Sequence, residues 1–421
     1  MLIEFSVANF RSLRERQTFS LAKAMGDELI ETNTFEAVAF NKFDLLRSAA
    51  IYGPNAGGKS NFLFALRAMR KTVLQSATSL QRGDKLPITP FRLSRETHNA
   101  PSEFEVTFIV NHVRYQYGFS ATVDRIHGEW LLAYPKGRPQ RWLGRIWNEQ
   151  SQGYDWELGS NLTGEKPLWQ KSTRENALFL STAVQLNSLQ LQPIYDWFNK
   201  TLRMVNITDE SYSALLCETN KKVQVMDFLH AADLSIEDII VKKKPFDASK
   251  LPNNMPEQLK VIIANNFKNQ QLIDLQTVHK SMEGEDVSFD FNDESDGTQK
   301  LFAFAGSWID SLANGCVLFI DELHDNLHPM LVRFLVQLFH SSETNPKNAQ
   351  LVFTTHETSI LNQEIFRRDQ IWFCEKDEGQ ATMLFPLTDF SPRKGRENLE
   401  LAYLSGRYGA LPYIRRLREH S

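Results

Sequence analysis

Cysteine is scarce in this sequence: there are three among 421 residues, Cys217, Cys316 and Cys374, and they lie far apart. An odd number of widely spaced cysteines predicts neither a disulfide framework nor a Cys-x-x-Cys metal or redox site. We therefore expect a protein of a reducing compartment, which by default is the cytoplasm.

Long apolar runs are absent as well. The richest run, Leu301–Ile309, already contains Gly306 and Ser307, and a membrane span needs roughly 18–20 apolar residues. The first residues also lack the basic segment and apolar stretch of a leader. The sequence therefore predicts no membrane segment and no direct membrane partner.

Neither sign of charge dominates. Lys and Arg number 47 against 51 Asp and Glu, a net charge of −4, which excludes a chain that is basic throughout but leaves a local basic groove open. Hydrophobic residues make up 42% and charged residues 23%, ordinary globular values. At about 100–200 residues per domain, two or three structural units are expected. Sustained heptads and internal repeats are missing, which excludes long coiled-coil arms.

Apolar periodicity predicts an α/β chain. Alternation with period two at 100–160 predicts an antiparallel meander, and residues 175–235 look mostly helical, with a further helix at 253–273. The last third alternates between apolar strands and helices, which predicts a parallel sheet with both faces covered. We expect an α/β fold with a mixed or parallel sheet core, an antiparallel meander and a short helical insert, divided into an N-terminal half (1–175), a mostly helical insert (176–285) and a C-terminal half (286–421).

The strongest motif is Gly53-Pro54-Asn55-Ala56-Gly57-Gly58-Lys59-Ser60, here called the phosphate loop. It fits Gly-x-x-x-x-Gly-Lys-[Ser/Thr], follows a buried strand at 48–52 and precedes a helix that begins near Asn61. Its glycines let backbone N–H groups surround phosphates, Lys59 reaches the β- and γ-phosphates, and Ser60 ligates Mg²⁺. This motif predicts a nucleotide site.

Two further strands end in polar residues. The apolar strand 316–320 is followed by Asp321 and Glu322, which suits a carboxylate for Mg²⁺ and a base for the attacking water. The strand 351–355 is followed by His356, a candidate sensor of the γ-phosphate at the same edge of the sheet. Ser295 precedes another helix as a capping residue, and the backbone near Gly297 suits an anion.

Together these elements resemble the ATP-binding-cassette ATPases, specifically their SMC- and RecF-like branch. Asn9-Phe10-Arg11-Ser12 looks like the opening of that branch. Residues 295–299 (Ser-Asp-Gly-Thr-Gln), here called the signature segment, are similar to the cassette signature, and His356 to the switch histidine. Asp296 stands where the common signature has glycine, and the glutamine that usually contacts Mg²⁺ is not assigned, with Gln81 as a candidate.

Residues 177–181, 324–329 and 403–412 look like a narrower family, the stand-alone prokaryotic defence ATPases that include RloA and AbiL, with relatives in Septu systems. The resemblance implies an ATP-hydrolysing homodimer with two composite ATP sites that controls a separate nuclease or toxin in anti-phage defence, and it leaves a higher assembly open. Only 65 residues follow His356, too few for the metal-binding domain of a self-contained OLD-type nuclease, so we expect no nuclease domain in this chain. ATP and Mg²⁺ are the expected cofactors.

The expected site residues fall into three groups. The catalytic residues are Lys59, Glu322 and His356, and the metal ligands are Ser60 and Asp321. The nucleotide contacts are Arg11, Ser12, Gly53, Pro54, Asn55, Ala56, Gly57, Gly58, Lys59, Ser60, Asn61, Ser295, Gly297, Thr298 and Gln299.

Other functions share these motifs. A DNA-repair ATPase of the RecF or SMC kind, which binds DNA directly, is the main alternative; a transporter subunit fits the N-terminal motif less well. The segment 134–147 mixes cations with aromatics, as nucleic-acid contacts do. A solvated hairpin whose tryptophans pack on the meander is the favoured interpretation, so contact with DNA or RNA, direct or through the partner, stays open.

Overall fold

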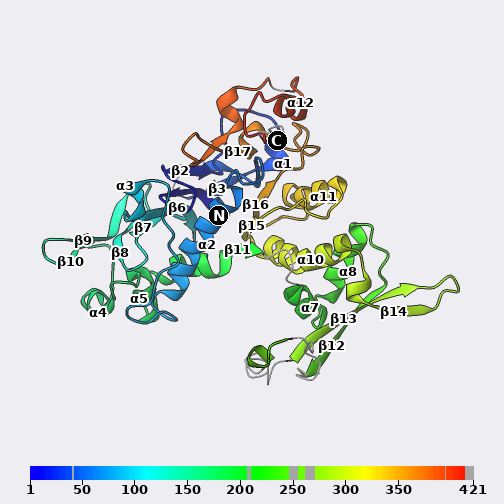
Figure 1. Ribbon diagram of the computed structural model, residues 1–421, viewed down its shortest axis with the longest axis horizontal. Coiled ribbons are helices and arrows are strands. Elements are labelled where there is room, and N and C mark those ends of the chain that lie inside the picture. Colours follow the sequence, from blue (N-terminus) through cyan, green and yellow to red (C-terminus); the bar gives the residue numbers. More distant parts are fainter. Residues whose placement is uncertain (40–41, 206–209, 246–254, 261–270, 394, 413–421) are drawn as a thin grey trace, which may run out of the picture. The chain divides into compact units, whose positions relative to one another are not determined.

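The computed structural model describes residues 1–39, 42–205, 210–245, 255–260, 271–393 and 395–412 (Figure 1). The chain divides into a first unit, residues 1–204, 311–325 and 332–421, and a second unit, residues 205–310 and 326–331. Most of the predicted helix at 253–273 lies outside the described residues. No helix among those described has the length and apolar content needed to cross a membrane.

The first unit contains an antiparallel sheet of seven strands. Phe104, Val106 and Phe108 are fully buried and alternate with more exposed residues, because one face of the sheet packs on the core. The meander predicted at 100–160 is thus confirmed. The strand order is β10 (Gly153–Leu158), β9 (Gln140–Asn148), β8 (Ile126–Tyr134), β7 (Val113–Ala121), β6 (Ser102–Val110), β1 (Leu2–Ala8) and β2 (Gln17–Ser20).

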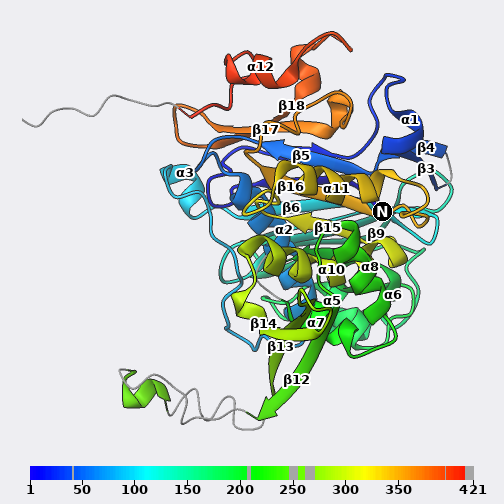
Figure 2. The same cartoon turned by 90° about the vertical axis from the view of Figure 1, so that its right-hand side faces the viewer.

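The second sheet of this unit has six strands and a parallel centre. Its order is β11 (Leu202–Val205), β15 (Val317–Ile320), β16 (Gln350–Thr355), β5 (Ser48–Tyr52), β17 (Ile371–Lys376) and β18 (Thr382–Pro386). Strands β15, β16, β5 and β17 pair in parallel, and β18 is antiparallel to β17. Figure 2 shows β17, β5, β16 and β15 in this order. Their continuous apolar runs predict this sheet, and the prediction is confirmed: β5, β15 and β16 are buried at every position.

Helix α2 (Lys59–Gln75) shares one hydrophobic core with both sheets. Phe62, Leu66, Met69 and Val73 are fully buried, at the helical spacing visible in the sequence. This packing holds the N-terminus of α2 directly after β5, where the phosphate loop joins the two.

Shorter elements complete the first unit. They are α1 (Ile30–Asn33), β3 (Thr34–Val38), β4 (Lys42–Leu46), α3 (Arg95–His98), α4 (Lys166–Ser172), α5 (Phe179–Gln185), α6 (Gln192–Asp196), a π-turn (Trp197–Thr201), two 3₁₀ turns (Arg368–Gln370 and Leu387–Phe390) and α12 (Leu399–Leu404). Helix α11 (Pro329–His340) begins in the second unit and continues in the first.

The second unit contains helices and a small antiparallel sheet. Its elements are α7 (Ser211–Cys217), α8 (Lys222–Ala231), β12 (Asp238–Pro245), β13 (Gln271–Lys280), β14 (Asp286–Asp290), a 3₁₀ turn (Phe291–Asp293) and most of α10 (Asp296–Asn314). Strand β13 lies between β12 and β14.

The structure contains two strands that the sequence did not predict, the first of them within the region 175–235 that was expected to be mostly helical. Residues 202–205 form strand β11, because they extend the six-stranded sheet beside β15. Residues 238–245 form strand β12, whose polar run Lys242–Lys244 gives no strand signal of its own and is held by pairing with β13. Lys243 and Lys244 also form ion pairs with Glu218 and Asp274. Of the residues assigned to the insert, 176–204 lie in the first unit.

The C-terminal motif at 403–412 packs on strand β17. The Tyr403 ring stacks on Phe373 at 5.4 Å, and its hydroxyl donates to the Ala410 carbonyl at 2.8 Å. The Ala410 N–H donates to the carboxylate of Glu375 at 2.6 Å. The motif therefore covers the strand that ends at Lys376, beside the site described next.

Candidate functional site

The phosphate loop connects the buried strand β5 to α2. Three of its residues have a positive φ: Gly53 (152°), Ala56 (64°) and Gly58 (110°). A Cβ at Gly53 would clash with the carbonyl oxygen of Cys374, and one at Gly58 with the side chain of Thr382. Glycine is required at both positions because β17 and β18 pass directly beside the loop.

Lys59 lies inside this loop and is 5% exposed. Its ammonium donates to the carbonyls of Gly53 at 2.6 Å and Pro54 at 3.1 Å. Burial lowers the pKa of Lys59, and Cys374, Glu322 and Asp321 act against that shift. A buried cation that donates to uncharged carbonyls of its own loop is well placed to meet an anion.

Asp321 and Glu322 follow β15, and Thr354 of β16 holds both. The Thr354 hydroxyl donates to Asp321 Oδ1 at 2.5 Å and accepts from the Glu322 N–H at 2.8 Å. Glu322 has a left-handed φ of 53°, a conformation that costs a non-glycine residue free energy and is retained where surrounding contacts fix it.

His356 follows β16 and approaches His324, two residues after Glu322. Their Nε2 atoms are 3.0 Å apart, and the rings are nearly perpendicular at 70°. His356 is exposed, whereas His324 is 9% exposed. The two residues meet because β15 and β16 are parallel neighbours whose carboxyl ends reach the same edge.

The phosphate loop, Glu322 and His356 line one cavity of about 400 Å³, here called the P-loop pocket, whereas Gly53 and Asp321 are not among its lining residues. Its lining residues are Pro54, Asn55, Ala56, Gly57, Gly58, Lys59, Ser60, Asn61, Glu322, His356 and Lys376. The structure thus brings the phosphate loop together with Glu322, His356 and Lys376, which lie far from it in the sequence. All of them belong to the first unit.

Arg11 and Ser12 join this site through Asn61. The Asn61 amide donates to the Ser12 hydroxyl at 2.7 Å and accepts from the Arg11 guanidinium at 3.4 Å. The guanidinium also stacks on the Phe64 ring at 4.4 Å. The Ser12 hydroxyl is 2.7 Å from that of Thr382. These bonds hold the N-terminal motif against the start of α2.

Sequence reasoning missed Lys376, Thr354, Thr382 and His324. Lys376 lines the pocket at the end of β17, and the Thr382 hydroxyl also donates to the Gly57 carbonyl at 3.1 Å. A position at a strand end was the available signal for Lys376. Thr354 and Thr382 carry no motif, and only the sheet order places them near the loop, whereas His324 begins the segment 324–329 that the sequence already singled out. Gln81 does not line the pocket; its carbonyl accepts from Asn176 at 2.7 Å.

The signature segment belongs to the second unit. The Ser295 hydroxyl accepts from the Thr298 N–H at 3.2 Å and caps α10. Gln299 donates through its amide to the Glu294 carbonyl at 2.8 Å. A Cβ at Gly297 would approach the Asn326 carbonyl at 3.1 Å, so little space is available there.

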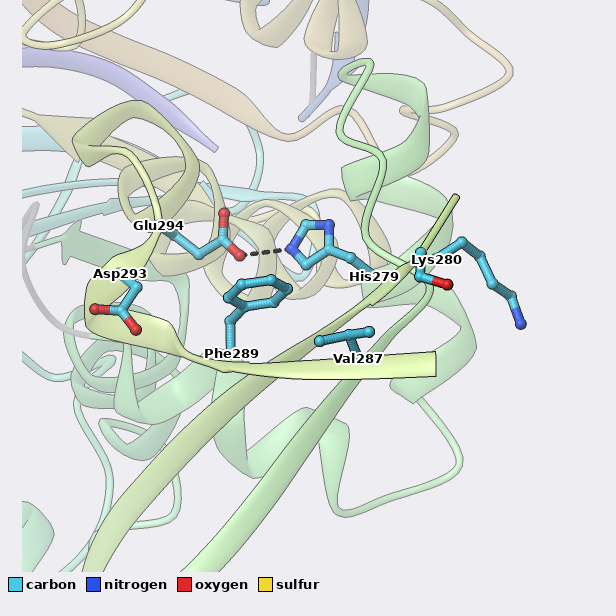
Figure 3. Close-up of a pocket in the computed structure, with 7 residues that line it drawn as sticks. His279, Lys280, Val287, Phe289, Asp293 and Glu294 are labelled. Carbon is cyan, nitrogen blue, oxygen red and sulfur yellow. Dashed lines mark hydrogen bonds and ion pairs between the residues drawn. The ribbon is translucent and has the colours of Figure 1, made fainter. Parts of the chain in front are cut away.

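Strand β13 holds the residue that precedes the signature segment. The carboxylate of Glu294 accepts from the Thr277 hydroxyl at 2.6 Å and pairs with His279 Nε2 at 2.7 Å. Figure 3 shows this pair beside Phe289 in a cavity of about 450 Å³. His279 Nδ1 lies 3.0 Å from the Ser235 carbonyl, so both ring nitrogens face acceptors. The pair anchors the entrance of α10 to the small sheet.

The phosphate loop fits a polyphosphate. Helix α2 has no carboxylate in its first turn, and its N-cap Gly58 makes no side-chain cap, so the first N–H groups are left for a ligand. Lys59 adds a cation. The phosphates of ATP suit this cradle in charge and in hydrogen bonding.

The oxygen donors fit Mg²⁺, which takes few protein ligands besides phosphates and water. Ser60 lines the pocket, and the carboxylate of Asp321 accepts a hydrogen bond from Thr354. Across the part of the chain that the structure describes, no group of three or more His, Cys, Asp or Glu is placed to hold a metal. An ion at Ser60 and Asp321 would therefore depend on phosphate oxygens.

No curated protein matches the chain. Among solved structures, the chain is similar to "Crystal structure of the SmcHead bound to the C-winged helix domain of ScpA", at 13% sequence identity and a TM-score of 0.41, over 91% of this chain and 97% of that chain. The family model "AAA domain, putative AbiEii toxin, Type IV TA system" matches residues 48–362, from strand β5 to beyond His356. The chain has the α/β fold of a P-loop ATPase and belongs to this AAA-domain family.

Proposed function

We propose that this protein hydrolyses ATP in the P-loop pocket and acts as a switch that controls a separate effector. The observation that carries this proposal is the pocket itself, in which the phosphate loop, Glu322 and His356 surround one cavity. An acidic strand end and a histidine beside an anion-binding helix start suit the transfer of a phosphoryl group to water.

Each residue has a distinct role in this mechanism. When bound, ATP supplies the phosphoryl group, and Mg²⁺ offsets the charge of its phosphates. Ser60 and Asp321 hold the ion, and Lys59 balances charge on the outer phosphates. Glu322 orients water and accepts its proton, and His356 contacts the terminal phosphate. Arg11 donates a hydrogen bond to Asn61 and in this way supports the start of α2 next to the phosphate loop.

The signature segment acts in a second subunit in this proposal. The chain carries one phosphate loop and one signature segment, so two copies arranged head to tail complete two sites. ATP would then hold the dimer together, and hydrolysis would release it. The resemblance to cassette ATPases supports this arrangement.

The biological setting that we propose is bacterial defence in the cytoplasm. The matching family description names a toxin and a toxin–antitoxin system, and the sequence resembles the RloA and AbiL defence ATPases. A nuclease or toxin would be the effector.

A DNA-repair ATPase, the alternative function, would instead bind DNA with strong dependence on salt. Two cations of the hairpin at 134–147, which the sequence offers as nucleic-acid contacts, have partners within the protein. Arg141 pairs with Glu157, and Arg145 is buried against Glu129.

Phosphate release from purified protein tests the proposed activity. We expect wild-type turnover, near-complete loss in Lys59→Ala, and ATP binding without turnover in Glu322→Gln, which should accumulate as a dimer. Glu343→Gln alters an exposed carboxylate outside the pocket and is the matched control. Wild-type protein without ATPase activity, or full turnover in Glu322→Gln, would refute the proposal.

Mixed subunits test the composite site. Ser295→Arg should block the signature segment and Lys59→Ala the phosphate loop, so each variant alone should be inactive. An equal mixture should recover about a quarter of wild-type activity per subunit, because half of the dimers then contain one intact site. No recovery at any mixing ratio would contradict a site shared between subunits.

A further inference from the structure

His324 and His356 form a side-chain pair at the P-loop pocket, and the proposed mechanism does not use the bond between them. Their Nε2 atoms are 3.0 Å apart and their ring centroids 3.8 Å. His356 lines the pocket and is exposed, whereas His324 lies beneath the surface. Both follow strands of the first unit, β15 and β16, which pair in parallel.

The distance constrains the protons of the pair. A hydrogen bond between two Nε2 atoms needs one N–H and one lone pair, so the two nitrogens hold one proton between them. The bond therefore fixes which edge of each imidazole faces the other. Rotation of the His356 ring would break it.

This constraint matters because His356 is exposed. An exposed histidine without such a bond samples several side-chain rotamers, and a ligand that needs one of them must order the ring when it binds. A ring that is held beforehand avoids that cost. His324 is itself packed in the segment after Glu322, so it offers a fixed partner.

We propose that His324 is a positioning residue for His356: its Nε2 holds the imidazole in the orientation that meets the terminal phosphate of ATP. This inference rests on the proposed function, since it takes ATP as the ligand of the pocket. His324 does not itself contact the nucleotide in this proposal. His324 should therefore affect the binding only of ligands that reach His356. ATP carries the terminal phosphate that does so and ADP lacks it, so the proposal predicts an effect on ATP binding and none on ADP binding.

Two substitutions separate the hydrogen bond from packing. His324→Gln keeps a nitrogen near the position of Nε2 and can donate or accept, whereas His324→Leu fills similar space without a polar atom. His127→Leu is the matched control, because His127 is a half-buried histidine of β8 whose bond to Thr122 lies outside the pocket.

Binding of a non-hydrolysable ATP analogue and of ADP, each with Mg²⁺, gives the decisive comparison. We expect His324→Leu to weaken the analogue by about fivefold to tenfold, the equivalent of one lost hydrogen bond, and to leave ADP within about twofold of wild type. His324→Gln should recover most of the loss, and His127→Leu should change neither ligand. Equal weakening of both ligands in His324→Leu, or no weakening, would overturn the proposal.

Nitrogen NMR of the nucleotide-free protein tests the bond without any ligand. The chain has 10 histidines, so selective labelling gives few signals, and His356→Gln assigns the relevant pair. We expect the His356 Nε2 signal to shift in His324→Leu and to stay near wild type in His324→Gln. An unchanged signal in His324→Leu would overturn the proposal. Wild-type protein that binds neither nucleotide would instead refute the proposed function, and the nitrogen spectra tell these two failures apart.

Discussion

Substitution of Thr354 by valine should remove the hydrogen bonds that hold Asp321 and Glu322 without changing the shape of the core. Thr354 is fully buried on β16, and its hydroxyl bonds to Asp321 Oδ1 at 2.5 Å and to the Glu322 N–H at 2.8 Å. Valine has almost the same volume, so no cavity forms. Both hydrogen bonds are lost.

The magnitude follows from these two bonds. A hydrogen bond to a charged carboxylate contributes about 1.5–3 kcal/mol and a neutral one about 1 kcal/mol. We therefore expect Thr354→Val to lower the free energy of unfolding by about 3 kcal/mol. Residues that orient metal ligands typically affect activity by about 10–100-fold, so ATP turnover should fall within that range, with a higher Mg²⁺ requirement.

Urea unfolding and phosphate release at varied Mg²⁺ measure the two effects. Thr354→Ser keeps the hydroxyl and should stay near wild type in turnover. Thr355→Val is the matched control, because the Thr355 hydroxyl accepts from the Glu357 N–H at 2.9 Å and bonds to neither carboxylate residue. Wild-type turnover in Thr354→Val, or equal losses in both valine variants, would show that Thr354 does not orient the pair.

Two further predictions concern buried ionisable groups of the first unit. Burial lowers the pKa of His340 from 6.5 to about 3, so below pH 6.5 the unfolded chain binds a proton that the folded protein excludes, and stability is lost as the pH falls toward 3. Between pH 7 and pH 5 the wild type should lose about 2 kcal/mol more than His340→Gln in urea unfolding; equal losses would contradict this assignment. Glu129 accepts hydrogen bonds from the N–H groups of Phe179 (2.7 Å) and Leu180 (3.0 Å) beside the fully buried Arg145. Glu129→Gln should cost about 3–5 kcal/mol because it leaves that guanidinium without a counter-charge, whereas Glu157→Gln, in an exposed pair with Arg141, should cost under about 1 kcal/mol; similar costs for the two variants would argue against a structural role for the buried pair.

Glu129 also holds residues 177–181 in place through hydrogen bonds to their backbone. Residues 177–181 lie against the antiparallel sheet, where Glu129 and Arg145 bind their backbone. Arg145 donates to the Ala177 carbonyl at 2.8 Å. Arg145 was considered as a nucleic-acid contact from the sequence, but it is fully buried. The pairing of β8 with β9 confirms that residues 134–147 lie in a hairpin.

The sequence by itself determined the local parts of this protein. The phosphate loop, the strands around it and the residues at their ends are each encoded by a short run of neighbours, since hydrophobic periodicity and glycine spacing act over a few residues. Elements predicted in this way, such as β16 at Gln350–Thr355 and the buried face of α2, agree with the structure.

Only the tertiary structure decided which strand ends meet. Thr354, Thr382 and Lys376 carry no local motif. Lys376 lines the pocket, and Thr354 and Thr382 bond to Asp321 and Gly57, because the strands of the six-stranded sheet lie side by side. The lysine run Lys242–Lys244 of strand β12 likewise depends on pairing with β13, whereas the β-branched residues 239–241 before it carry a strand signal of their own. Pairing and burial join residues that are distant in the chain, and such contacts leave no trace in a window of neighbouring residues. The chemistry of the loop was therefore visible in the sequence, whereas the support of Asp321, Glu322 and His356 came from the fold.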